Sequence, residues 1–141
     1  MFEQASVNEV SANKLLALLN AEPNLSPTLL GYKGSTIAME AKYTVNPLKK
    51  LKYFNEGKSL LEKAIKSEPQ NIELRYLRLA IQTNIPTFLN YSKNIDSDKI
   101  LLLGAIKSKL ILDEDLLKKI IYFLNQCKYL SQSEKNQMTI K

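Results

Sequence analysis

The sequence predicts an all-α fold of about six helices, and three observations indicate it. Only four glycines and five prolines occur among the 141 residues, so long stretches are free of residues that disfavour helix. Those stretches are rich in Leu, Ile, Lys and Glu, and their apolar residues recur at helical spacing. Several of them open with an N-capping signal. A chain of this length fits one domain, which we expect over residues 1–130.

The expected helices follow one another with short connections. They cover about residues 8–19, 26–43, 46–68, 71–84, 96–112 and 113–129. The first is indicated by an apolar stripe that includes Val10, Leu15 and Leu19, and Pro23 follows its end. The second and third open with the strongest start signal in the chain, a capping residue before a proline. The two pairs are Ser26 with Pro27 and Asn46 with Pro47.

Three glycines lie inside the second and third expected helices. They are Gly31, Gly34 and Gly57. A glycine inside a helix costs about 0.5–1 kcal/mol relative to alanine, so its presence needs a reason. For Gly31 and Gly34 the simplest is the close approach of a neighbouring helix.

The later helices have weaker start signals. The fifth begins near Asp96 or Asp98, where acidic side chains suit the positive end of the helix dipole. It is apolar on nearly all sides, which predicts a buried helix. Residues 131–141 form a polar tail, in which Ser131 and Glu134 have the spacing of a capping box for a short helix.

The basic excess does not point to a nucleic-acid partner. The net charge is +6, but the lysines are spread along the chain at positions typical of solvated helix faces. The densest cluster is Lys49, Lys50 and Lys52. It is interpreted as a solvated helix start, with a phosphate-binding patch as the alternative, because nucleic-acid binders concentrate their charge more strongly.

The composition excludes common kinds of metal site and catalytic pair. The chain contains no histidine, and Cys127 is its only cysteine. A zinc site rich in His and Cys is therefore excluded, as are Ser-His-Asp and Cys-His catalytic groups. We expect no metal, no cofactor and no catalytic residue, and a buried thiol at Cys127.

We expect no membrane span, because no apolar run reaches 18 residues. The start of the chain lacks the basic and apolar regions of a signal peptide, so none is expected within it. The location stays open between the cytoplasm and, where a signal has been removed, the periplasm.

Residues 68–80, which read Glu-Pro-Gln-Asn-Ile-Glu-Leu-Arg-Tyr-Leu-Arg-Leu-Ala, resemble the turn between two tetratricopeptide repeats. Small Gly57 and Ala64 and large Leu61 match the helix before that turn. The resemblance covers about residues 22–85 and implies antiparallel helical hairpins stacked as a short TPR-like array. The whole chain is also similar to helical proteins of Bacteroidetes-type bacteria, which implies no particular activity.

Two features depart from that family. Pro23 and Pro69 lie 46 positions apart, whereas the repeat is about 34 residues long. Arg75 and Arg78 stand where the family has large apolar residues, and they share one helix face. If that face points inward, each arginine needs an acidic partner.

The two arginines allow two interpretations. The first is an internal salt-bridge network, for which the candidate partners are Glu40, Glu56, Glu73 and Asp98. The second is a site that binds carboxylate or phosphate, since the guanidinium fork suits such anions. The residues that could complete such a site are Tyr32, Lys33, Tyr53 and Tyr91.

The expected function is a non-enzymatic module that binds a protein or peptide on the surface of stacked hairpins. Two or three hairpins form a short array, so we expect it to act as a homo-oligomer or with a partner chain. The alternatives are anion binding through Arg75 and Arg78 and a purely structural role. An enzyme that uses Glu40 or Glu56 as an acid or base would need a deep pocket that holds a carboxylate of raised pKa.

Overall fold

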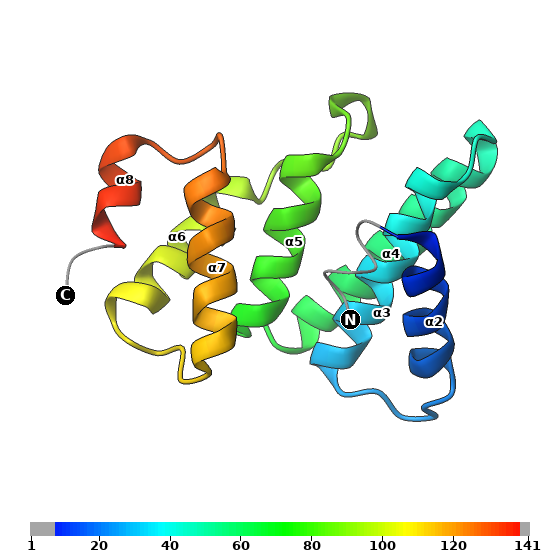
Figure 1. Cartoon of the computed structure of the whole chain (residues 1–141), viewed down its shortest axis with the longest axis horizontal. Coiled ribbons are helices and arrows are strands. Elements are labelled where there is room, and N and C mark those ends of the chain that lie inside the picture. Colours follow the sequence, from blue (N-terminus) through cyan, green and yellow to red (C-terminus); the bar gives the residue numbers. More distant parts are fainter. Residues whose placement is uncertain (1–7, 139–141) are drawn as a thin grey trace. The chain divides into compact units, whose positions relative to one another are not determined.

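The structure is a computed structural model that describes residues 8–138 (Figure 1). Within this range the chain forms seven α-helices, two short 3-10 helices and no strand, which confirms the predicted all-α fold. The α-helices are α2 (Glu9–Asn20), α3 (Pro27–Glu40), α4 (Pro47–Ser67), α5 (Ile72–Asn84), α6 (Ile95–Lys107), α7 (Glu114–Gln126) and α8 (Gln132–Gln137). The 3-10 helices are η1 (Ala41–Tyr43) and η2 (Thr87–Leu89). No helix in residues 8–138 is long and apolar enough to cross a membrane.

The helix starts lie where the capping residues predict them. The side chains of Ser26 and Asn46 accept hydrogen bonds from backbone amides in the first turns of α3 and α4. Asp113 does the same for α7. Ser131 and Glu134 form the complete capping box of α8, each side chain bonding to the other residue's backbone. These bonds satisfy amide groups that have no partner within the helix.

Three helices end earlier than the sequence predicts. α3 ends at Glu40, and η1 replaces its last turn. α6 ends at Lys107 because Lys109 adopts a left-handed backbone conformation (φ 55°), which an α-helix cannot continue through. α7 ends at Gln126 and not near residue 129.

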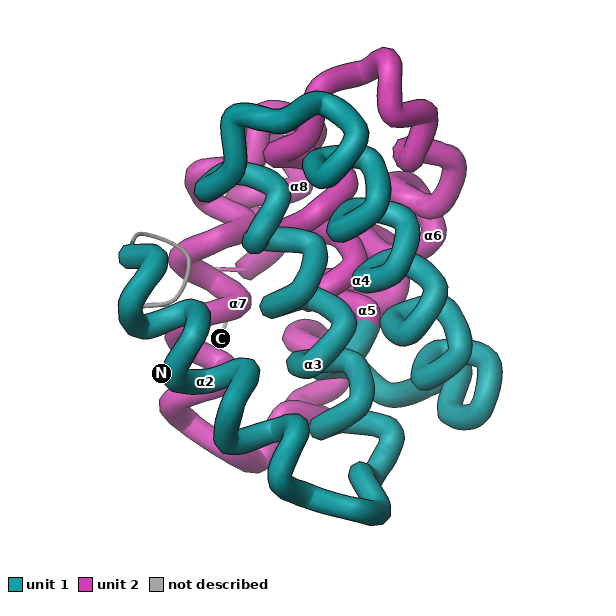
Figure 2. Tube along the Cα trace, turned by 90° about the vertical axis from the view of Figure 1, so that its right-hand side faces the viewer, with its two compact units in different colours: residues 1–74 teal, residues 75–141 magenta. Residues whose placement is uncertain are grey.

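The chain forms two compact units, coloured separately in Figure 2. Unit 1 comprises residues 1–74 and unit 2 comprises residues 75–141, so the boundary falls within the first turn of α5. The single domain over residues 1–130 stays a prediction, and each unit is described by itself.

In unit 1, α3 packs against both α2 and α4. The contact with α4 is closest at Gly34 and Gly57. A Cβ atom on Gly34 would lie 2.6 Å from the carbonyl oxygen of Gly57, and one on Gly57 would lie 2.5 Å from the amide nitrogen of Ala38. The two backbones therefore touch directly, which confirms the predicted reason for Gly34, whereas the same prediction for Gly31 stays a prediction.

The start of α5 is tied to α3 within unit 1. Asn71 caps α5 by accepting a hydrogen bond from the amide of Leu74, and its side-chain nitrogen donates to Thr28 Oγ1 at 2.9 Å. The hydroxyl of Tyr32 donates to the carboxylate of Glu73. The Pro-Asn turn is thereby joined to the first half of α3.

In unit 2, fully buried leucine and isoleucine side chains of α5, α6 and α7 form the core. They include Leu77, Leu102, Ile120 and Leu124. The rings of Tyr76 on α5 and Phe123 on α7 meet edge to face with centroids 5.6 Å apart, a favoured aromatic geometry.

The prediction that the fifth helix is buried is wrong for one face of α6. Leu102 and Ala105 are buried, but the side chain of Ile100 is 66% exposed. In the described part of unit 2, α6 therefore has one buried face and one exposed face, although its sequence is apolar on nearly all sides. Its outer face has no neighbouring helix to cover Ile100.

The Gly34–Gly57 contact yields a test of stability. We expect Gly57→Ala to lower the free energy of unfolding by about 2–3 kcal/mol, because the added methyl group meets backbone that cannot move aside. Gly104→Ala is the control, since a Cβ atom there meets nothing within 4 Å and alanine favours helix by about 0.5–1 kcal/mol. Urea unfolding measures both. A Gly57→Ala variant as stable as the original chain would contradict direct backbone contact.

Candidate functional site

Arg75 and Arg78 bind one buried carboxylate within unit 2. Arg75 Nη1 donates to Asp98 Oδ1 at 2.9 Å. Arg78 donates twice, from Nε to Oδ2 at 2.8 Å and from Nη2 to Oδ1 at 2.7 Å. Gln82 Nε2 donates to Oδ2 at 2.9 Å, and its Oε1 accepts from the amide of Asn94 at 3.1 Å. The side chain of Asp98 is fully buried.

This network joins α5 to the start of α6. Of the four acidic partners that the sequence suggests for the arginines, the structure supplies Asp98. The bidentate pair between Arg78 and Asp98 is the strong form of such a contact. Because the carboxylate already occupies guanidinium donors of both arginines, these contacts favour the internal salt bridge over a site for an external anion.

The other predicted site residues lie in different places. Tyr32 bonds to Glu73 at the start of α5. Tyr91 lies in unit 2, in the segment before α6, and only 4% of it is exposed. Lys33 and Tyr53 both line a groove in unit 1. Of the six predicted site residues, the structure therefore brings Arg75 together with Arg78, and Lys33 together with Tyr53.

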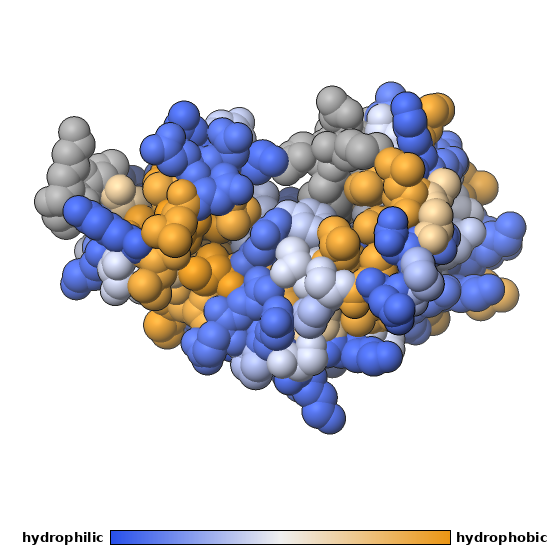
Figure 3. Space-filling view, turned by 90° about the horizontal axis from the view of Figure 1, so that it is seen from below, coloured by the Kyte–Doolittle hydropathy of each residue, from blue (hydrophilic) through white to orange (hydrophobic). Residues whose placement is uncertain are grey.

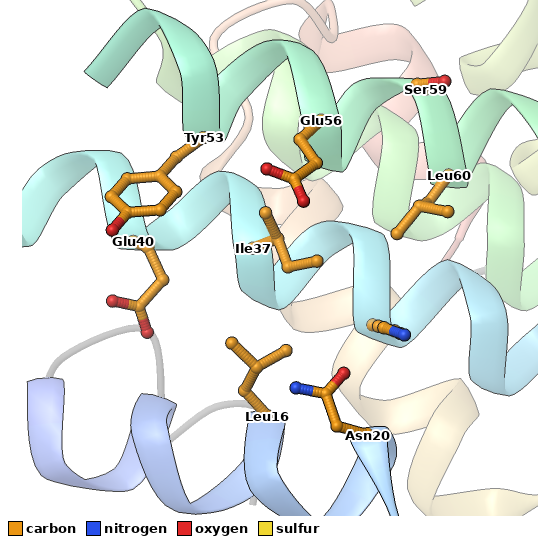
Figure 4. Close-up of a pocket in the computed structure, with 9 residues that line it drawn as sticks. Leu16, Asn20, Ile37, Glu40, Tyr53, Glu56, Ser59 and Leu60 are labelled. Atoms are coloured by element: carbon orange, nitrogen blue, oxygen red, sulfur yellow. The ribbon is translucent and has the colours of Figure 1, made fainter. Parts of the chain in front are cut away.

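The groove lies along α3, between side chains of α2 and α4 (Figure 4). Its volume is about 490 Å³. The lining residues are Leu16, Asn20, Lys33, Ile37, Glu40, Tyr53, Glu56, Ser59 and Leu60. Figure 4 shows Leu16 and Asn20 reaching up from α2 toward Ile37, with Glu56 directed at Ile37 from the α4 side.

Helical spacing explains why these side chains share one surface. Lys33, Ile37 and Glu40 are four and three positions apart on α3, so they lie on one face. Tyr53, Glu56 and Leu60 repeat the pattern on α4 in steps of three and four. The groove therefore has Ile37 near its middle with Glu56 beside it, and it has Lys33 and Glu40 toward its two ends.

Glu40 has an unusual environment in this groove. Its Oε1 atom is buried and has no hydrogen-bond partner among the described residues. Burial, and then the negative charge of Glu9 on α2, raise the pKa of the Glu40 carboxyl above its ordinary 4.5. The pKa of Tyr43 is raised by burial and by the charges of Glu40 and Glu9. Both influences on the Glu40 carboxyl thus act against its ionised form.

Sequence reasoning considered Glu40 and Glu56 as arginine partners or as acids and bases, but not as groove residues. It missed Leu16, Asn20 and Leu60 altogether. The spacing of Lys33, Ile37 and Glu40 was a usable signal, because it places two opposite charges on either side of an apolar residue along one face.

A second, smaller pocket of about 320 Å³ lies in unit 2 and is lined by Thr83, Asn84, Phe123, Gln126, Cys127 and Lys128. Figure 3 shows apolar side chains at the surface on the face seen from below. The most exposed large apolar residues include Val45 in unit 1 and Leu112 in unit 2. Lys49, Lys50 and Lys52 are all exposed in the first turns of α4, as expected for a solvated helix start.

Cys127 is a buried free thiol. Within residues 8–138, no group of three His, Cys, Asp or Glu side chains could hold a metal ion.

The Asp98 network yields a second test. We expect Asp98→Ala to lower the free energy of unfolding by about 3–5 kcal/mol, because it leaves two arginines without their carboxylate in a buried setting. The double variant Asp98→Leu, Arg78→Met should lower the free energy of unfolding clearly less than Asp98→Ala alone, because it also removes the Arg78 charge. Urea unfolding of the single and double variants measures the difference. Equal losses would show that charge pairing is not the cause.

Glu40 yields a test with a defined pH dependence. Because its pKa is higher in the folded chain than the ordinary 4.5, its ionisation opposes folding. The stabilising effect of its protonated form is present below pH 4.5 and is lost as the pH rises through the raised pKa. Glu40→Gln should therefore be more stable than the original chain at pH 7, and the advantage should vanish near pH 3. Thermal unfolding at both pH values measures it, and a less stable variant at pH 7 would contradict the burial of this charge.

In comparisons with known proteins, no family model, curated protein or solved structure matches this chain. The resemblance to tetratricopeptide repeats therefore stays a prediction from sequence. The function has to be argued from the geometry of the chain itself.

Proposed function

We propose that the chain is a non-enzymatic protein-interaction module, and that the groove of unit 1 receives a segment of a protein partner. The observation that carries this proposal is the groove itself, a cavity of about 490 Å³ along α3 whose lining combines apolar side chains with Lys33, Glu40 and Glu56. Concave sites with an apolar lining and a few placed polar groups are the usual form of binding sites.

The dimensions suit a peptide segment. Lys33 and Glu40 are seven positions apart, which corresponds to about 10 Å along the axis of α3. This is the length of two helical turns or of three extended residues. Leu16, Ile37 and Leu60 offer apolar contacts, and Tyr53 adds an aromatic side chain of the type that is enriched at binding hot spots.

Stacked hairpins in a TPR-like array are part of the same proposal. Packing of α3 against both α2 and α4 and the Pro-Asn turn before α5 support it. Such arrays present a concave surface to a partner. A second copy of this chain is the competing occupant, since a short array gains surface by self-association.

An enzyme is the second candidate, because a carboxylate of raised pKa lies in a cavity. Burial and the charge of Glu9 account for that pKa without any reaction. In the described structure Glu40 Oε1 has no hydrogen-bond partner, and no hydrogen bond joins this atom to a second acid or base. Binding is therefore the better supported function.

Anion binding through Arg75 and Arg78 is less well supported than the groove. Both guanidinium groups are already bonded to Asp98. A purely structural role leaves the buried Glu40 Oε1, which has no hydrogen-bond partner in the described structure, without an explanation.

A groove-blocked variant tests the proposal. A phage-displayed library of random peptides is selected on the full chain, and the enriched peptides are titrated against Ser59→Trp and Lys66→Trp. Ser59 lines the groove, whereas Lys66 is exposed on the same helix and outside it. We expect Ser59→Trp to weaken binding at least about 10-fold by filling the groove, which corresponds to about 1.4 kcal/mol, and Lys66→Trp to have no effect. The proposal fails if no enriched peptide distinguishes the two variants.

A further inference from the structure

The geometry points to a partner segment that carries a lysine or arginine side chain, which enters the groove beside Glu40 and Glu56 and pairs with their carboxylates. Apolar residues on either side of this cation would contact Ile37 and Leu60. The inference rests on the proposed function, because it names the chemistry of the segment that the groove receives.

The first argument is the unsatisfied carboxylate. A carboxylate is an acceptor only, and Glu40 Oε1 is buried without a donor in the described structure. Buried polar atoms are normally hydrogen-bonded, so an exception calls for an explanation such as a missing ligand. A ligand that reaches the Glu40 carboxyl must bring a donor, and a cationic donor forms the stronger bond with a carboxylate.

The second argument is the sign of the local charge. Burial raises the pKa of Glu40, and the negative charge of Glu9 raises it further. Glu56 adds a further carboxylate to the groove lining. An acidic segment would be repelled here, and an apolar one would bury Glu40 further without a partner. A cationic side chain is attracted by these carboxylates and also gives Glu40 a partner.

The third argument is the polarity along the groove. Lys33 lies at the opposite end from Glu40, and Ile37 lies between them. The basic side chain of the segment is therefore attracted toward the Glu40 end of the groove and repelled from the Lys33 end. The planar fork of arginine presents several donors to a carboxylate, so arginine should bind more tightly than lysine in this groove.

The test uses the peptides that distinguish Ser59→Trp from Lys66→Trp. Each is synthesised with its basic residue intact and with citrulline in its place, which keeps the shape and removes the charge. Both peptides are titrated against the original chain, Glu40→Gln and Glu22→Gln. Glu22 is exposed and does not line the groove, so Glu22→Gln is the matched control. Glu40→Gln removes an unfavourable charge, so it should remain folded, and its circular dichroism spectrum verifies this.

We expect the citrulline peptide and the Glu40→Gln variant each to weaken binding roughly 10-fold, the effect of losing a charged hydrogen bond. The two changes together should weaken it little further, because they remove the same contact. Glu22→Gln should have no effect.

Three results would overturn the inference. Groove-dependent peptides without a basic residue, or with one that is insensitive to Glu40→Gln, would refute it and leave the proposed function standing. The absence of any peptide that is sensitive to Ser59→Trp would refute both. Self-association that is abolished by Ser59→Trp, with no peptide bound, would show that the groove receives a second copy.

Discussion

The direct contact between the backbones of α3 and α4 at Gly34 and Gly57 is the constraint on which the groove depends. Because no side chain separates the helices there, α3 and α4 are held in one register. That register places Glu56 opposite Ile37 and brings Tyr53 toward Glu40 (Figure 4). A larger residue at either glycine would push the helices apart and change the width of the groove along α3.

The two units differ in how many hydrogen-bond donors surround a buried carboxyl group. In unit 2, Asp98 is fully buried, and donors from Arg75, Arg78 and Gln82 surround it. In unit 1, Glu40 is less buried, yet one of its oxygens has no partner in the described structure. In unit 2, both oxygens of the buried carboxylate accept hydrogen bonds, and these bonds join α5 to α6. In unit 1, the Glu40 carboxyl has an oxygen without a hydrogen-bond donor, and a ligand can supply a donor to this carboxyl. Sites at which a buried polar group lacks its partner are where function is expected.

Local rules predicted much of the fold. The capping residues placed the starts of α3, α4 and α8, and the glycines indicated a close helix approach. Asp98 was among four acidic residues proposed as partners for the arginines, but the choice among them depends on which helix packs against α5. The helix end at Lys107 depends on one left-handed residue, and no propensity rule predicts such a conformation at a lysine.

The groove could not be predicted in the same way, because its lining comes from three helices. Lys33 and Tyr53 were chosen as site residues for an anion, and their position beside two glutamates became visible only with the register of α3 and α4. The exposure of Ile100 has the same origin, since sequence periodicity does not reveal which face of a helix lacks a neighbour.

The most direct test of the account is the pKa of Glu40, measured by carboxyl ¹³C NMR in the free chain and with a saturating groove-bound peptide. The account predicts a pKa above 4.5 in the free chain and a lower value in the complex, because a bound cation favours the ionised carboxylate. A pKa that does not change on binding would contradict the central claim that Glu40 receives the charge of a partner.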